Sequence, residues 1–260
     1  MHMKKTASVF IVLALVAPAI VAAQSATTQD QISQQQQQQQ QQRNLQTLMA
    51  KVKSQLSQEI TRRIAAMRSF EASLKNSMLT AGADMKSSLG AISTQIGAHI
   101  TTLQILQAQI EKETDVTKLR NSVASMNSLY QTYELAVIKA SIIIGASNIN
   151  AIADQMSALA EKLTVNVSAL SQAGFSFPDK SIKTALEEAK SRSINAMNNV
   201  QALQPANGDQ ATQASNIAVI SGAIKTIQGA QLDIQVSQRN IKDTINKIIT
   251  ATPSQPGTSN

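Results

Sequence analysis

Cysteine and tryptophan are absent from this 260-residue sequence, and its aromatic residues are limited to two tyrosines and four phenylalanines. Without cysteine the chain has no disulfide, no thiol nucleophile and no cysteine-ligated metal. Large aromatic side chains supply much of the buried area of thick protein cores. The apolar residues that remain are mostly alanine, aliphatic residues and methionine, which favour thin seams between helices.

Glycine and proline are also scarce, with nine and five residues. Because these residues break regular structure most strongly, the predicted elements are long. Apolar residues recur at alternating steps of three and four, which indicates one buried stripe per helix. We therefore predict an all-α fold over residues 43–250, an elongated antiparallel up–down bundle of about five long helices with coiled-coil-like seams. Leu45 begins the first stripe, and Ile60, Ile64 and Met67 are expected to be buried in it.

Four breaks separate the predicted helices, and each is marked by residues that end one helix, by residues that cap the next, or by both. In chain order they are Gly82 as a left-handed end with Asp84 as a cap, Thr114 or Asp115 as a cap, Gly174 with Pro178 and with Asp179 as a cap, and Pro205 with Asn207 and Gly208. Within the long helix that starts after Asp115, we expect a bend near residues 139–145.

Residues 1–23 have the features of a secretory signal peptide. Lys4 and Lys5 precede an apolar run over residues 9–21, and small residues lead to an expected cleavage before Gln24. The run is short for a permanent membrane anchor, which takes about 20 residues; an uncleaved anchor is the alternative. We expect an exported protein that is extracellular, periplasmic or associated with the cell envelope.

Two further segments have low sequence complexity. Residues 24–42 form a glutamine-rich lead-in with nine consecutive glutamines at 34–42. Such a tract is a polar linker, or it continues the following helix, since glutamine is a good helix former. Residues 251–260 contain two prolines and no apolar face, so we predict a disordered tail.

The formal charge of +7 is concentrated in residues 43–75, which hold seven basic and two acidic side chains. A solvated helix face is the simplest interpretation. The alternative is contact with an anionic polymer, such as wall polysaccharide or extracellular DNA, through Arg62, Arg63, Arg68 and Lys75. Specific nucleic-acid recognition is disfavoured, because no aromatic residues interleave with these charges to stack on bases.

Catalytic and metal-binding patterns are missing. His99, the only histidine beyond the predicted signal peptide, lies between Ile96 and Leu103 and is expected at or beside a seam. It has no second histidine or cysteine with which to hold a metal, and no Ser/His/Asp set or glycine-rich phosphate loop is recognisable. Tyr130 and Tyr133 are expected to form an aromatic pair in a seam. We predict a protein that is not an enzyme and has no cofactor.

The apolar stripe broadens over Leu135–Ala153. We interpret this segment as a helix buried on several sides. The alternative is a membrane-inserting segment, as in helical pore-forming toxins, although Lys139, Asn148 and Asn150 disfavour residence in hydrocarbon.

The last predicted helix places glutamines on its apolar stripe. The stripe includes Ile217 and Ile224, and Gln231 and Gln238 continue it. Polar residues in a seam suggest that this half of the helix is either more hydrated or faces a partner. The leading functional hypothesis is a structural or adaptor protein that presents long helical faces to itself, or to a helical or cell-wall partner.

Residues 114–137 (TDVTKLRNSVASMNSLYQTYELAV), DQMSALAEKL at 154–163 and AGF at 173–175 carry a resemblance to a known group. This layout resembles uncharacterised secreted, coiled-coil-like proteins of ultrasmall (Patescibacteria-type) bacteria and some actinobacteria. The matching features are the pair Tyr130 and Tyr133, an apolar stretch and the later Leu-Ala-Glu-Lys-Leu segment. Gln131 stands where that group has arginine, and no proline follows near Lys139. The resemblance implies architecture and export, with no assigned activity.

Overall fold

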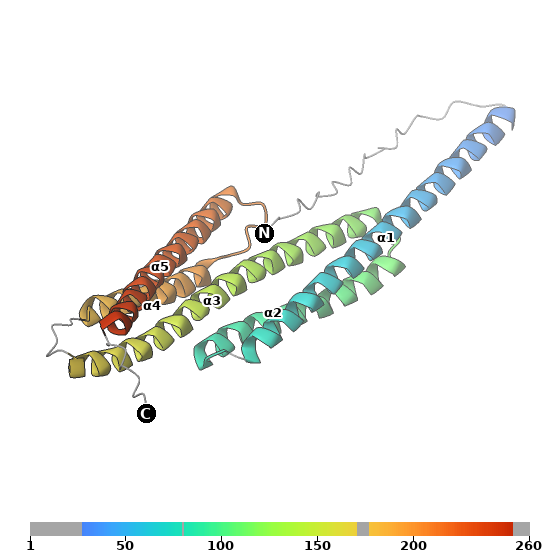
Figure 1. Ribbon diagram of the computed structural model, residues 1–260. Helices are drawn as coiled ribbons and strands as arrows, with labels where there is room; N and C mark the ends of the chain where they lie inside the picture. Colours follow the sequence, from blue (N-terminus) through green and yellow to red (C-terminus); the bar gives the residue numbers. More distant parts are fainter. Residues whose placement is uncertain (1–27, 80, 171–176, 252–260) are drawn as a thin grey trace. The chain divides into compact units, whose positions relative to one another are not determined.

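The computed structural model describes residues 28–79, 81–170 and 177–251, and all regular structure in these ranges is helical. The elements are α1 (Thr28–Leu79), α2 (Ala83–Lys112), α3 (Val116–Leu170), α4 (Asp179–Asn199), the short 3-10 helix η2 (Val200–Ala202) and α5 (Gln210–Ala251) (Figure 1). The predicted all-α bundle of five long helices is confirmed. The predicted signal peptide, Gly174 and residues 252–260 of the predicted tail lie outside the described residues.

The chain divides into two compact units, residues 1–48 and 49–260. The described part of the first unit is the start of α1, so the glutamine tract is helical. Every side chain from Gln34 to Leu48 is exposed. Leu45 is 54% exposed, so its predicted place on the buried stripe is wrong. The stripe begins at Val52, where α1 first contributes a buried residue to the second unit.

The second unit contains two hydrophobic cores that share α3. The first core joins α1, α2 and the first half of α3, and it includes Ile60, Ile64 and Met67, with exposed fractions of 0%, 7% and 0%. Their predicted burial is confirmed. The second core joins the rest of α3 to α4 and α5. The end of α4, η2 and the start of α5 also contribute buried residues to the first core, so the two cores meet along the middle of α3.

The broad apolar run of α3 lies where the two cores meet. Met126 and Tyr133 belong to the first core, whereas Met156 and Val167 are buried farther along. At about 100° per residue, the second pair lies on the other side of the helix from the first. Over residues 136–146 both sides are buried. This overlap explains the apolar run at Leu135–Ala153, and α3 continues through residues 139–145 as uninterrupted helix.

Contacts between helices give their directions. Three pairs of neighbouring segments are antiparallel, because in each pair the contacts occur in opposite order along the two segments. For α1 and α2 the contacts are Lys53 with Glu111 and Ser57 with Gln107. For α3 and residues 179–204 they are Lys139 with Gln201 and Asp154 with Lys190, and for residues 179–204 and α5 they are Arg192 with Asp233 and Gln204 with Asn216.

Small residues recur at buried positions of α3 and α5. Alanines recur every seven residues on α3, and α5 carries small or short polar residues at the same interval. They are Ala146, Ala153 and Ala160 on α3 and Asn216, Ala223, Ala230, Ser237 and Thr244 on α5, all of them buried. Short side chains allow helix axes to approach closely. Helix α4 supplies the two fully buried large residues of the second core, Ile182 and Leu186.

The helix ends only partly follow the predictions. Gly82 has a φ of −67° and extended backbone, so the predicted left-handed end is wrong, and no side chain caps α2 there. Asp179 is the first residue of α4 rather than its cap; its carboxylate pairs with Lys183 Nζ at 3.0 Å. The Asp115 carboxylate, in contrast, accepts hydrogen bonds from the N–H groups of residues 117 and 118, which confirms it as a cap.

The break before α5 is also confirmed. Asn207 and Gly208 have φ angles of 47° and 90°, in the left-handed region that suits glycine and asparagine. Asp209 then caps α5, because its carboxylate accepts hydrogen bonds from the N–H groups of Ala211 and Thr212. A hydrogen bond from the Thr212 hydroxyl, together with these two backbone bonds, holds the pKa of Asp209 below its usual value. The turn therefore fixes where α5 starts and which side of it meets α3 and α4.

Candidate functional site

Helix α5 has two apolar sides, divided by a ridge of isoleucines. The ridge residues recur every seven positions and are half-buried or buried: Ile220, Ile227, Ile234, Ile241 and Ile248. On one side of the ridge lie the buried small and short polar residues of α5. On the other side lie Ile217 and Ile224, which are 67% and 44% exposed. The prediction that these two isoleucines form the buried stripe is wrong, since Asn216 and Ala223 occupy it instead.

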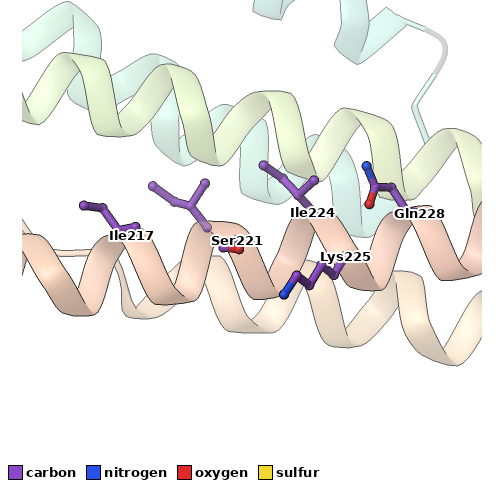
Figure 2. A pocket seen from close by; sticks show the side chains of 6 residues that line it. Ile217, Ser221, Ile224, Lys225 and Gln228 are labelled. Atoms are coloured by element: carbon purple, nitrogen blue, oxygen red, sulfur yellow. The ribbon is translucent and has the colours of Figure 1, made fainter.

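We name the exposed side the outward face of α5. It begins with isoleucines and continues with glutamines, and comprises Ile217, Ile220, Ser221, Ile224, Gln228, Gln231, Gln235 and Gln238. Its first half forms a shallow groove lined by Ile217, Ile220, Ile224 and Gln228, with Lys225 at the border. In Figure 2, Ile217, Ile224 and Gln228 project from one side of α5, and Lys225 points to another.

The spacing within the outward face is typical of a helix that packs against a second helix. Single exposed isoleucines are common on protein surfaces. Here Ile217, Ile220 and Ile224 follow the three–four spacing of a coiled-coil seam. Gln231 and Gln238, the predicted partner-facing residues, continue that spacing and are both exposed. A glutamine amide both donates and accepts hydrogen bonds, so it can be satisfied by a second amide.

The predicted tyrosine pair lies in the seam between α1 and α3. The rings of Tyr130 and Tyr133 are 5.5 Å apart, and Tyr133 makes an edge contact with Phe70 at 5.9 Å. The Tyr133 hydroxyl donates a hydrogen bond to the Ala66 carbonyl at 3.4 Å. Burial raises the pKa of Tyr133. The aromatic rings thus contact one another, which confirms the predicted packing pair.

Arg63 joins this aromatic cluster. Its guanidinium lies 4.3 Å from the centre of the Tyr130 ring and 2.7 Å from the Glu59 carboxylate. It also donates hydrogen bonds to the Met126 carbonyl and the Asn127 side chain, both at 3.2 Å. Because its side chain is only 14% exposed, Arg63 holds α1 against α3 and has little surface for a ligand.

The other basic residues of α1 do not converge on one site. Arg62 pairs with Glu59 at 2.8 Å and Lys75 pairs with Glu71 at 2.7 Å. Burial opposes ionisation of Glu59, but hydrogen bonds and charge from Arg62 and Arg63 outweigh it and lower the Glu59 pKa. Arg68 is exposed beside a second shallow groove between α1 and α2. By helical geometry, Arg68 and Lys75 lie on a different side from Arg62 and Arg63. Contact with an anionic polymer remains a prediction.

His99 and Lys139 are ionisable groups in apolar surroundings. His99 is half-buried beside the buried residues Ile96 and Ile100, and its Nδ1 atom is buried without a hydrogen-bond partner. Burial lowers the pKa of His99 and also that of Lys139, whose Nζ donates to the Gln201 carbonyl at 3.4 Å. Among residues 28–79, 81–170 and 177–251, no three histidine or carboxylate side chains gather closely enough to hold a metal ion.

Helix α3 is long and apolar enough over Val116–Val167 to cross a membrane, by length and composition alone. The core helix of a soluble protein meets the same criterion, and α3 lies between the two cores. Comparison of the chain with protein-family models, curated proteins and solved structures gave no match. The resemblance to secreted coiled-coil-like proteins therefore remains a prediction.

Proposed function

We propose that this is a non-enzymatic structural or adaptor protein of the cell envelope or extracellular space, which binds a helical partner, including further copies of itself, through the outward face of α5. The observation that carries this proposal is the second apolar side of α5. A helix that serves only its own bundle needs one buried stripe. Helix α5 has a buried stripe of small residues and, beyond the isoleucine ridge, a further stripe with the spacing of a seam.

The electrostatics of the outward face support the same function. None of its eight residues is charged, and charged residues are depleted at the centres of protein–protein interfaces. Ile217, Ile220 and Ile224 supply apolar area, and the four glutamines supply amides that can pair with a partner. A flat, uncharged strip along a helix suits a second helix better than a small ligand, for which pockets are usually concave and enclosed.

The test is a pair of double substitutions in the chain lacking residues 1–23. Ile217→Glu with Ile224→Glu places two charges on the outward face. Leu232→Glu with Val236→Glu is the matched control, since these residues are 60% and 51% exposed on a different side of α5. Light scattering against protein concentration measures self-association, and capture from a native envelope fraction measures other partners. We expect the first variant to lose binding and the control to keep it.

Equal binding by both variants and the unaltered chain would refute the proposal. So would a compact, non-binding monomer at every concentration that also captures nothing from the envelope fraction. Circular dichroism of each variant checks that its helices are intact, because all four substituted residues are exposed and their replacement should not unfold the bundle.

Membrane insertion through Leu135–Ala153 is the second candidate, since α3 is long and apolar enough to cross a membrane by length and composition alone. Insertion would require the bundle to open, because buried residues of this segment pack in both cores. Leakage of dye from vesicles, with and without anionic lipid, tests this function. Leakage that Lys139→Leu increases would support it, and absence of both leakage and vesicle binding would exclude it. Contact with an anionic polymer through α1 is tested separately, because such binding weakens steeply with added salt.

A further inference from the structure

We infer that residues 34–48 of one copy dock antiparallel on the outward face of α5 of a second copy, so that the copies join head to tail. This inference rests on the proposed function and names its partner: the glutamine-rich start of α1 in another molecule of the same chain. Two separate observations carry it, one on each of the surfaces that would meet.

The first observation concerns the start of α1. Residues 34–48 are helical, and all of their side chains are exposed. An isolated helix in water is marginal, and most helical stability in proteins comes from packing one face. Leu45 and Leu48 are 54% and 52% exposed, so this segment carries apolar area that the described residues of the chain leave uncovered. A helix of this kind is stabilised when a second helix packs on it.

The second observation is that the two surfaces match in order. One side of the α1 segment carries glutamines and then leucines at steps of three and four: Gln34, Gln38, Gln41, Leu45 and Leu48. The outward face of α5 carries isoleucines and then glutamines. When the helices are antiparallel, the two leucines meet Ile217, Ile220 and Ile224, and the glutamines meet the glutamines. Parallel helices would place the leucines against glutamine amides.

Charge agrees with this pairing. Arg43 is the one charged residue in positions 34–48, and at about 100° per residue it lies on the side opposite Leu45. The outward face of α5 has no charged residue. The residues that would meet on the two strips are therefore uncharged, and Lys225 lies at the border of the groove. Paired glutamines satisfy each other, since each amide offers donors and an acceptor.

Two outward faces of α5 could also pair with each other in parallel, isoleucine on isoleucine. That arrangement leaves Leu45 and Leu48 uncovered, whereas the head-to-tail arrangement covers both exposed strips with one contact. The interface is heterologous, because different surfaces of the two copies meet. Such interfaces produce open chains of molecules unless their rotation closes a ring.

The experiment uses two variants that each lose one of the surfaces. One variant carries Leu45→Glu and Leu48→Glu, and the other carries Ile217→Glu and Ile224→Glu. Sedimentation velocity gives the mass of each alone and of an equimolar mixture. We expect the unaltered chain to form assemblies larger than dimers and each variant alone to be monomeric. The mixture should form a one-to-one dimer that grows no further, because each variant retains the surface that the other has lost.

The other outcomes overturn the inference in distinguishable ways. If the Leu45/Leu48 variant still associates with itself, the contact is between α5 helices. If the Ile217/Ile224 variant still associates with itself, the contact excludes α5, and the proposed function fails too. If both variants are monomeric and their mixture is monomeric, the surfaces do not meet. An unaltered chain that stays monomeric but captures an envelope protein through Ile224 overturns this inference and leaves the proposed function standing.

Discussion

Two substitutions test which side of α5 faces the core. On this helix a small residue is buried and a large apolar residue is partly exposed, so enlarging the small residue should cost more stability than truncating the large one. Ala230 is fully buried in the second core, whereas the large residue Ile224 is 44% exposed. We expect Ala230→Leu to be destabilising, because three additional carbons enter a packed seam of small residues. Overpacking of this kind costs about 1–3 kcal/mol. Ile224→Ala truncates a side chain that is 44% exposed, so its cost should stay well below the value of about 2–5 kcal/mol that is usual for a buried isoleucine.

The assay is urea unfolding followed by circular dichroism, at a protein concentration low enough that the chain is monomeric. Ala223→Leu, which adds the same side chain one heptad earlier, should reproduce the loss of stability. Two results together would refute this orientation of α5. They are a loss of about 2–5 kcal/mol in the free energy of unfolding for Ile224→Ala, as is usual for a buried isoleucine, and no loss for Ala230→Leu. Helix α5 would then be rotated relative to the structure. The outward face would in that case be part of the core.

Three further predictions concern one residue each of α1, α2 and α3. Ile60→Ala should lower the free energy of unfolding by about 2–5 kcal/mol, because Ile60 is fully buried. The control Lys51→Ala should change it by no more than roughly 0.5 kcal/mol. Equal losses for the two variants in urea unfolding would contradict this prediction. Because burial lowers the pKa of His99, the unfolded state binds its proton more readily, so stability should fall as the pH drops below the ordinary histidine value of 6.5. His99→Gln should remove that part of the pH dependence of the melting temperature, and an unchanged profile would refute it. Gly145→Ala should add about 0.5–1 kcal/mol of stability, because alanine loses less conformational freedom than glycine when the helix forms. The new methyl group fits, since it would lie 3.9 Å from the Ile227 side chain of α5. A lower melting temperature would count against this prediction.

The sequence predicted the helices well where large apolar residues form the core. In α1 and α2 the three–four spacing of isoleucine, leucine and methionine coincides with the buried stripe, as Ile60 and Met67 show. The length of α3 could also be predicted, since no proline or glycine cluster interrupts it before residue 170. Its broad apolar run has a structural cause, because a helix shared by two cores needs apolar residues on two sides.

The stripe of α5 could not be predicted from the same rule. A pattern search follows large apolar residues and assigns Ile217 and Ile224 to the core. The structure buries Ala223 and Ala230 instead, and α3 carries buried alanines at the same interval of seven residues. The signal that could have found this is the recurrence of small residues every seven positions on both helices. A search for a second stripe beside the isoleucine ridge would have separated the two sides of α5.

Local backbone chemistry explains the remaining differences. Asp115 and Asp209 cap helices because each carboxylate reaches two following N–H groups. Asp179 sits one position too late to do so and pairs with Lys183 instead. Gly82 was expected in a left-handed conformation, but the chain continues through it in an extended one. Residue type alone does not distinguish these cases, because they depend on where the helix starts to within one residue.

The most direct test of the outward face uses the absence of cysteine from the chain. A single Ile224→Cys substitution introduces the only thiol, and Leu232→Cys does the same on a different side of α5. The rate at which each thiol reacts with a maleimide is measured from dilute to concentrated protein, with envelope extract added in a parallel series. If α5 binds a partner through its outward face, the Cys variant at 224 should become protected as the concentration or the extract increases, while the variant at 232 stays reactive. Equal reactivity of both thiols under every condition would contradict the proposed function.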